Sequence, residues 1–444
     1  MVNIPNHKIL KNKINSRRAV ISVIGLGYVG LPLCTALLNA NFKVFGIDNN
    51  LNKIKILQRG DSYISTVKNS EIRKYNANNF YPSNNFKNIA CSDVIIICVP
   101  TPINNNKKPN MQYVKNVVKQ VDKYVKKNQL IILECTSYPG TTEEYFLPIF
   151  NRKKLNVGQD IFLGYSPERE DPGNKNYSIT KGNLAKVVSG YSLNCKQLTA
   201  QVYKSVTKKI FLTKNIKTAE FTKLLENIYR SVNIGLVNEL FSLCEKMGIN
   251  MNDALSAAKT KPFGFNGFEP GPGVGGHCIP VDPYYLTYKA KEFGLTTKFI
   301  KLAGEINDNR PIQIANKIVS YLRKKKSLNN KKILILGITY KKNSDDLRGS
   351  PIITICKLLR SKIKNKILVC DPKMNKFADN SLKKFDFIDL KTLKNEKFLN
   401  NLALCFIGAN HDIFDLKFIS KNVDMIFDSR NSFKAQNLSN IQSI

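Results

Sequence analysis

A glycine-rich turn near the start of the chain limits the possible folds most tightly. Residues 19–24 form a β-branched, apolar run that enters Gly25-x-Gly27-x-x-Gly30 and continues into a helix-like apolar pattern. A second apolar run ends at Asp48, about 20 residues further on. This spacing permits close approach of a pyrophosphate to a helix N-terminus, and the acid accepts a hydrogen bond from the adenosine ribose. The pattern predicts a dinucleotide-binding βαβ unit, and Asp48 favours NAD because its charge repels a 2′-phosphate.

Alternating strand and helix signals continue from about residue 19 to 210. Continuous apolar runs at 94–102, 130–136 and 161–167 end in turn or polar residues, as expected of buried parallel strands whose carboxyl ends carry functional loops. From 217 to about 258, apolar residues recur at helical spacing. This change of period predicts a long helix followed by another.

A third segment begins near residue 331 and contains a second set of strand signals. Apolar runs at 331–337, 367–371, 402–408 and 425–428 each end at Gly or Asp, without a second complete G-x-G-x-x-G. We therefore predict an α/β fold in which two doubly wound, Rossmann-like domains are joined by a central helical region. The predicted parts are an NAD-binding domain, a central region and a second Rossmann-like domain at 1–210, 211–315 and 316–444.

Composition narrows the class of protein. Ten cysteines without a C-x-x-C pair and three histidines argue for reduced thiols and against a metal site. The polar first 18 residues and the absence of long apolar runs predict a cytoplasmic protein without a signal peptide or membrane span. The net charge of +36 is spread along the chain beside abundant Asn, so we expect no nucleic-acid partner. Its summed field would instead help to gather an anionic substrate.

A cysteine follows a run of Pro and Gly at 270–276. Cys278 comes two residues after the last of these glycines, and Asp282 lies four residues further on. Glycines leave out side-chain bulk, so a substrate can approach the sulfur closely. A buried cysteine in a tight turn is the alternative. Together with the dinucleotide turn, this loop favours a covalent catalyst.

Two stretches, 166–173 and 270–286, carry a family resemblance. The chain resembles the nucleotide-sugar 6-dehydrogenases of the UDP-glucose and GDP-mannose dehydrogenase superfamily from Gly25 to about residue 430. The two stretches are most similar to the branch that oxidises UDP-N-acetylhexosamines, and in particular UDP-N-acetyl-D-glucosamine. By that resemblance the first domain holds NAD, the central helices form the interface of a homodimer or a higher homo-oligomer, and the last domain holds the UDP moiety.

The resemblance implies oxidation of a C6 alcohol to a carboxylate with two NAD, for the synthesis of surface polysaccharide precursors. A thiolate at Cys278 would capture the intermediate aldehyde and pass through a thioester. Lys223 and Asn227, one helical turn apart, would hold the substrate oxygen. Glu168 would be the base for hydrolysis, helped by Thr136 and Asp282.

Further contacts are implied by the same resemblance. The implied cofactor contacts are Gly25, Gly27, Tyr28, Val29, Gly30, Asp48, Lys53, Thr101, Pro102, Thr136 and Arg348. The implied substrate contacts are Glu168, Arg169, Lys223, Asn227, Phe268, Gly275, Lys341 and Lys342.

One departure from the superfamily bears on the substrate. UDP-glucose dehydrogenases typically carry a Lys immediately before the Asp of the cysteine loop, where this chain has Val281. The difference favours an N-acetyl group at C2, and the stretch 166–173 favours UDP-N-acetylglucosamine. The N-acetylmannosamine, N-acetylgalactosamine and glucose substrates remain alternatives. A non-catalytic binding regulator would lack at least one chemical residue, and a simple two-electron hydroxyacid dehydrogenase would need neither the cysteine nor a third domain.

Overall fold

Contacts between residues divide the chain into two units. The first comprises Met1–Glu226 and Tyr284–Leu295, and the second comprises Asn227–Pro283 and Thr296–Ile444. The computed structural model describes residues 5–64, 66–75, 78–170, 184–328, 330–374, 380–433 and 438–444.

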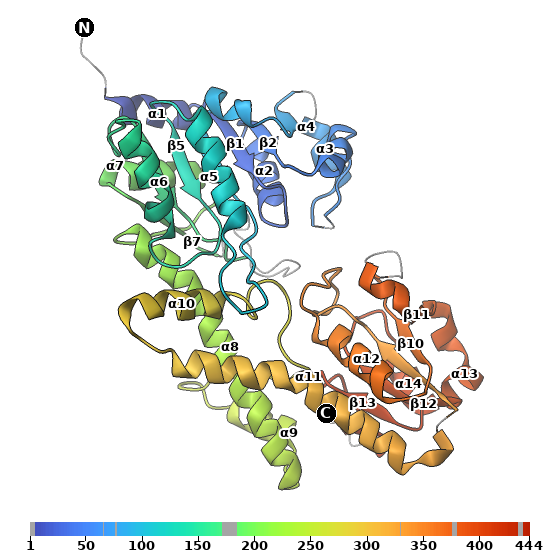
Figure 1. Cartoon of the computed structure of the whole chain (residues 1–444). Coiled ribbons are helices and arrows are strands. Elements are labelled where there is room, and N and C mark those ends of the chain that lie inside the picture. Colours follow the sequence, from blue (N-terminus) through green and yellow to red (C-terminus); the bar gives the residue numbers. More distant parts are fainter. Residues whose placement is uncertain are drawn as a thin grey trace. The chain divides into compact units, whose positions relative to one another are not determined.

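The first unit is built on an eight-stranded sheet with the order β3-β2-β1-β4-β5-β6-β7-β8 (Figure 1). Every pair is parallel except β6 with β7, so the predicted parallel strands are confirmed. The direction of β7 had no sequence signal, because its five residues are all buried, as in the parallel strands. The strands are β1 (Val20–Ile24), β2 (Lys43–Ile47), β3 (Phe80–Ser83), β4 (Val94–Ile97), β5 (Leu130–Leu133), β6 (Phe162–Tyr165), β7 (Lys186–Gly190) and β8 (Ile210–Leu212).

Helices cover both faces of this sheet. Val94 and Ile96 point into a core shared with α2 and α7, whereas Ile95 and Ile97 point into a core shared with α5 and α6. Burial on both faces explains why the strands are continuous apolar runs rather than alternating ones. The helices are α1 (Asn6–Asn15), α2 (Gly30–Asn39), α3 (Leu51–Gln58), α4 (Asn69–Tyr75), α5 (Gln112–Tyr124), α6 (Thr141–Arg152), α7 (Leu193–Lys204) and α10 (Asp282–Ala290).

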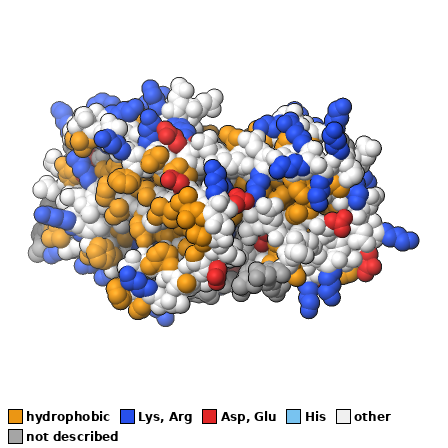
Figure 2. Space-filling model, turned by 90° about the horizontal axis from the view of Figure 1, so that it is seen from below, with side chains coloured by type: hydrophobic (Ala, Val, Ile, Leu, Met, Phe, Trp, Pro, Cys, Tyr) orange, Lys and Arg blue, Asp and Glu red, His pale blue; other side chains and the backbone are white. Residues whose placement is uncertain are grey.

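The predicted long helix and its successor are present as α8 (Ile216–Lys246) and α9 (Met251–Ala258). The chain turns between them at Gly248, whose φ is +70°, and α9 begins after Asn250, whose side chain accepts hydrogen bonds from the backbone of the first turn. Many apolar side chains of α8 are exposed, and Figure 2 shows hydrophobic side chains gathered on one face of the molecule. The buried residues of α8 include polar ones, namely Glu220, Lys223, Asn227, Ser231 and Asn238.

The second unit contains a six-stranded, wholly parallel sheet with the order β11-β10-β9-β12-β13-β14. This confirms the predicted second α/β fold. Residues of α11 and α12 pack on one face of the sheet, and residues of α13 and α14 pack on the other (Figure 1). The strands are β9 (Lys332–Leu336), β10 (Ile367–Cys370), β11 (Asp386–Phe387), β12 (Leu402–Ile407), β13 (Ile426–Asp428) and β14 (Ile441–Ser443). The helices are α11 (Lys298–Lys324), α12 (Pro351–Lys362), α13 (Glu396–Asn400) and α14 (Leu416–Asn422).

Short 3-10 helices complete the secondary structure at Phe86–Cys91, Lys291–Phe293, Lys326–Leu328, Asn380–Lys384 and Leu390–Lys394. Among the helices of the described residues, none has the length and apolar character needed to cross a lipid bilayer.

Candidate active site

The glycine turn joins β1 to α2, and its three glycines have different surroundings. Gly25 has a φ of +92°, and a Cβ added there would lie 2.6 Å from the carbonyl oxygen of Cys98. A Cβ at Gly30 would lie 1.9 Å from the carbonyl oxygen of Gly25, whereas one at Gly27 would meet no described atom within 4 Å. The fold itself therefore requires Gly25 and Gly30. The open space at Gly27, beside the first turn of α2, fits a pyrophosphate.

Asp48 follows β2 and lies beside this turn. Its Oδ2 accepts a hydrogen bond from the backbone N of Leu26 at 2.9 Å, and its Oδ1 accepts one from Asn50 at 2.9 Å. Lys53 Nζ lies 3.4 Å from Oδ2. The structure thus brings the predicted Gly, Asp and Lys residues together at the carboxyl edge of β1 and β2. An acceptor held there fits the ribose hydroxyls of NAD.

The other predicted residues of the first unit follow consecutive strands of the sheet. Thr101 and Pro102 come after β4, Thr136 after β5, and Glu168 after β6. Because these strands are parallel and adjacent, their carboxyl ends meet at one edge of the sheet. The structure therefore brings these predicted residues to one edge of the sheet, whereas their function stays a prediction.

The carboxylate of Glu168 is surrounded by donors. Its Oε1 accepts from the backbone N of Arg169 at 2.7 Å and of Glu170 at 2.6 Å, and its Oε2 accepts from Lys186 Nζ at 2.8 Å. Burial acts to raise the pKa of Glu168, but the charge and hydrogen bond of Lys186, assisted by the Glu170 N–H and Lys223, lower it below its ordinary value. Glu168 is therefore ionised at neutral pH.

Two predicted substrate contacts, Arg169 and Lys223, lie near Glu168 in the first unit. The guanidinium of Arg169 donates to Glu226 Oε1 from Nε at 2.8 Å and to the carbonyl oxygen of Ala185 from Nη1 at 2.7 Å. Lys223 is 8% exposed on α8, so it is not an ordinary solvated lysine. A buried cation of this kind suits stabilisation of an oxyanion.

In the second unit, the cysteine loop is tied into a tight turn. The backbone N atoms of Val281 and Asp282 both donate to the carbonyl oxygen of Cys278, at 3.0 and 2.8 Å. Asp282 is 2% exposed, and its Oδ2 accepts from Asn227 Nδ2 at 2.5 Å. The thiol-bearing residue Cys278 is exposed. The structure therefore brings together Asn227, Cys278 and Asp282, as the sequence predicts.

The loop that contains Arg348 supports the cysteine loop. Gly276 N donates to the carbonyl oxygen of Arg348 at 2.8 Å, and a Cβ at Gly275 would lie 2.5 Å from the Cβ of Tyr340. The guanidinium of Arg348 forms an ion pair with Asp346 at 2.6 Å. Any larger residue at Gly275 would push the cysteine loop away from this support.

Three other predicted substrate residues have structural or surface positions in the second unit. Lys342 pairs with Asp412 at 2.5 Å, and the carbonyl oxygen of Lys341 accepts from the Thr339 hydroxyl at 3.0 Å. Phe268 packs on the small core of α8 and α9. Their part in binding stays a prediction.

The second Rossmann-like domain repeats the construction of the first glycine turn. Gly337, with a φ of +72°, donates to the carbonyl oxygen of Cys370 at 2.8 Å, and Ile338 N donates to Asp371 Oδ2 at 2.8 Å. Here, however, the same oxygen also faces His411 Nε2 at 3.3 Å. Sequence reasoning missed this equivalence because the segment lacks the full glycine spacing.

Three polar residues of the first unit were also missed. Glu220 on α8 accepts hydrogen bonds from Gly140 N at 2.5 Å and Thr142 N at 2.9 Å, at the N-terminus of α6. Burial raises the pKa of Glu220 to about 7. Glu134 and Lys186 form a buried ion pair behind Glu168. The position of Glu134 directly after β5 was a usable signal, whereas Lys186, the first residue of β7, had none.

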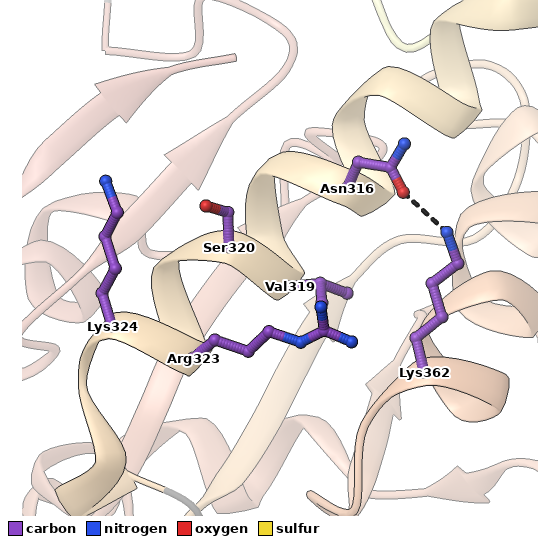
Figure 3. Close-up of a pocket in the computed structure, with 6 residues that line it drawn as sticks. All are labelled: Asn316, Val319, Ser320, Arg323, Lys324 and Lys362. Carbon is purple, nitrogen blue, oxygen red and sulfur yellow. Dashed lines mark hydrogen bonds between the residues drawn. The ribbon is translucent and has the colours of Figure 1, made fainter.

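A cavity of about 460 Å³ lies between α11 and α12 in the second unit (Figure 3), and none of its lining residues is among those predicted for chemistry. Lys362 Nζ donates to Asn316 Oδ1 at 2.6 Å across it. Its cations stand in the last turns of the two helices, where positive charge offsets the helix dipole. It is lined by Asn316, Val319, Ser320, Arg323, Lys324 and Lys362.

Comparisons with known proteins agree with the two-domain geometry. Three domain models of the UDP-glucose/GDP-mannose dehydrogenase family match: the NAD binding domain over 19–207, the central domain over 217–309 and the UDP binding domain over 334–435. The chain is 40% identical to Protein CapL of Staphylococcus aureus over 380 residues, which cover 84% of this chain and 87% of that protein. It is 35% identical to a UDP-N-acetyl-D-glucosamine 6-dehydrogenase of Pseudomonas aeruginosa over 76% of this chain and 79% of that protein.

A solved structure shows the same fold. The native structure of the UDP-N-acetyl-mannosamine dehydrogenase Cap5O from Staphylococcus aureus superposes with a TM-score of 0.80 and 29% identity, covering 96% of each chain. The resemblance stated from the sequence motifs is thereby confirmed, as is NAD as the cofactor.

Proposed function

The chain belongs to the UDP-glucose/GDP-mannose dehydrogenase family, and from that premise we propose that it oxidises C6 of a UDP-N-acetylhexosamine to the carboxylate. The proposed UDP-N-acetylhexosamine is UDP-N-acetylglucosamine. The observation that carries the proposal is the cysteine loop of the second unit. Its exposed Cys278 precedes a turn that holds the buried Asp282 against Asn227. Such a loop serves a reaction with a covalent intermediate.

The reaction proceeds in two oxidations and one hydrolysis. NAD supplies the hydride acceptor for both oxidations. After the first, the Cys278 thiolate adds to the aldehyde carbon and forms a thiohemiacetal, whose oxyanion is stabilised by Lys223 and Asn227. After the second, the adduct is a thioester. Water then adds to the thioester carbon, the C–S bond breaks, and the carboxylate product leaves the restored thiolate.

Glu168, Thr136 and Asp282 serve the hydrolytic step in this proposal. The three donors around Glu168 and its lowered pKa keep it ionised. An ionised carboxylate can orient the attacking water and accept its proton as the water adds to the thioester carbon. The roles of Lys341, Lys342, Arg348 and Phe268 as ligand contacts belong to the same proposal.

The N-acetyl group is supported by Val281 in place of Lys and by relatives whose names specify UDP-N-acetylglucosamine and UDP-N-acetylmannosamine. The stretch 166–173 supports the gluco epimer, although residues 171–173 lie outside the described residues. A panel of UDP-sugars with NAD, followed by NADH absorbance, tests the proposal. We expect two NADH per UDP-N-acetylglucosamine and little activity on UDP-glucose. A preference for UDP-glucose overturns the branch, a preference for another epimer overturns the substrate, and one NADH per sugar overturns the four-electron reaction.

We also propose that the protein lies in the cytoplasm, that its functional parts are 1–210, 211–315 and 316–444, and that its product feeds surface polysaccharide synthesis.

The proposed assembly is a homodimer. Exposed Leu236, Leu240 and Leu243 on α8 support the dimer, because apolar patches of this kind mark interfaces. Analytical ultracentrifugation tests it. Leu240→Asp should give monomers, whereas the control Ile413→Asp, at an exposed apolar residue outside α8, should not. A monomeric wild type contradicts the proposal.

A further inference from the structure

A buried group of titratable side chains lies directly behind Glu168. Lys186, the first residue of β7, is 1% exposed and contacts both Glu134, which follows β5, and Glu168. Tyr203 on α7 is fully buried and donates its hydroxyl to Glu134 Oε2 at 2.5 Å. None of these three residues, Lys186, Glu134 and Tyr203, enters the reaction described above.

The ammonium of Lys186 contacts three side chains, those of Glu134, Glu168 and Tyr203. It donates to Glu134 Oε1 and to Glu168 Oε2, and it lies 5.1 Å from the centre of the Tyr203 ring. A buried lysine is costly unless it is paired in this way. Burial acts to lower the pKa of Lys186, but the two carboxylates raise it above its ordinary value, so the ammonium stays charged.

Glu134 shares that ammonium with Glu168. It is 2% exposed as a residue, and its two oxygens are taken by Lys186 and Tyr203. Burial raises the pKa of Glu134 to about 7, whereas Glu168 stays ionised. The two carboxylates that share Lys186 therefore differ in pKa. They also differ in burial, because the side chain of Glu168 is 19% exposed whereas that of Glu134 is fully buried.

We propose that Lys186 is a positioning residue for thioester hydrolysis: its ammonium holds the carboxylate of Glu168 in place and ionised, while Glu134 limits how much of that charge acts on Glu168. The inference rests on the proposed role of Glu168. Both oxygens of Glu168 are then oriented by fixed donors, so the direction in which it can accept from water is set by the fold. Hydrolysis, and not hydride transfer, is the step that depends on this group.

The charged and titratable groups around Glu168 come from several elements. Lys223 on α8 adds a second positive charge, and Arg169 is neutralised by Glu226. Of the side chains that the structure describes, Lys186 is the one with a hydrogen bond to the Glu168 carboxylate. The groups are Glu134, Lys186, Tyr203, Lys223, Arg169 and Glu226.

The test uses opposite changes in the acid limb of the pH profile for hydrolysis, measured by single turnover with UDP-N-acetylglucosamine and NAD. Lys186→Met removes the positive charge, so the limb should move up by about one to three pH units. Glu134→Gln leaves the whole charge of Lys186 to Glu168, so the limb should move down. The matched control Tyr203→Phe removes only the hydroxyl that donates to Glu134, so it should move the acid limb least. A folding defect would lower the active fraction of a variant, but it would not move the acid limb up in Lys186→Met and down in Glu134→Gln.

Because Lys186→Met leaves two buried carboxylates without their cation, which destabilises the fold, the double variant Lys186→Met with Glu134→Gln provides a second test. It should move the limb in the same direction as Lys186→Met. Equal profiles for all folded variants, or shifts in one direction for Lys186→Met and Glu134→Gln, overturn the inference.

Intact-mass detection of a sugar adduct on Cys278 separates this inference from the proposed function. Glu168→Gln should accumulate the thioester at every pH, and Lys186→Met should accumulate it below the pH of its shifted acid limb, where the wild type still hydrolyses it. If Glu168→Gln accumulates no adduct, the role of Glu168 is wrong. If Glu168→Gln accumulates it while Lys186→Met hydrolyses at the wild-type rate and pH profile, only the positioning role is wrong.

Discussion

Adding a single methyl group to the glycine turn should separate NAD binding from folding. At Gly27 an added Cβ meets no described atom within 4 Å, and its φ lies outside the left-handed range, so Ala fits the free protein. At Gly30 the added Cβ would lie 1.9 Å from the carbonyl oxygen of Gly25, which is rigid backbone. The same substitution at two positions of one turn therefore probes the ligand in one case and the fold in the other.

The expected magnitudes follow from these distances. Gly27→Ala should leave the free energy of unfolding within about 1 kcal/mol of wild type, because alanine only restricts the unfolded chain. In the complex its methyl occupies the space of the pyrophosphate, and overpacking of this kind costs about 1–3 kcal/mol. That corresponds to NAD binding weaker by about 5- to 150-fold. Gly30→Ala should lower the free energy of unfolding by about 3 kcal/mol or more, because the overlap forces the turn apart.

Isothermal titration with NAD and thermal unfolding measure the two quantities on the same samples. Wild-type NAD affinity in Gly27→Ala would refute the placement of the pyrophosphate over this turn. Wild-type thermal stability in Gly30→Ala would refute the turn geometry itself. A Gly27→Ala protein that melts far below wild type would show that the space is filled by protein.

Three further predictions follow from single residues. Cys278→Ser should reduce overall turnover by about 10⁴-fold while NAD and UDP-sugar binding survive, since the hydroxyl gives no accessible anion; two NADH per sugar at the wild-type rate would contradict the covalent mechanism. Asp48→Ala should narrow the preference for NAD over NADP in initial-rate assays, whereas Asp371→Asn, at the equivalent position of the second domain, should leave it unchanged. Burial raises the pKa of Glu220 from 4.5 to about 7, so the folded state holds the proton more tightly and stability is lost as pH rises from 4.5 to 7. In denaturant unfolding across this range, wild type should lose about 3 kcal/mol more than Glu220→Gln, and parallel curves would contradict the assignment.

The local pattern of the chain was enough to predict the framework of the site. The spacing of Gly25, Gly27 and Gly30 and the strand-terminal Asp48 depend on the geometry of one turn and two neighbouring strands. Continuous apolar runs predicted parallel strands, and parallel strands bring their carboxyl ends together whatever their length. The position of Glu168 at that edge followed from the sequence alone.

Only the tertiary structure decided which buried polar groups are partners. Glu134 and Lys186 are 52 residues apart, and Asn227 and Asp282 are 55 apart. No local period relates such positions, because each pair is brought together by the packing of separate strands or helices. The sequence of a buried strand also gives no information about its direction, so the antiparallel pairing of β6 with β7, the strand that carries Lys186, had no signal. Residue type and spacing were therefore enough to predict where ligands and chemistry belong. Burial and long-range pairing, which depend on the whole fold, decided the charge and orientation of the predicted groups.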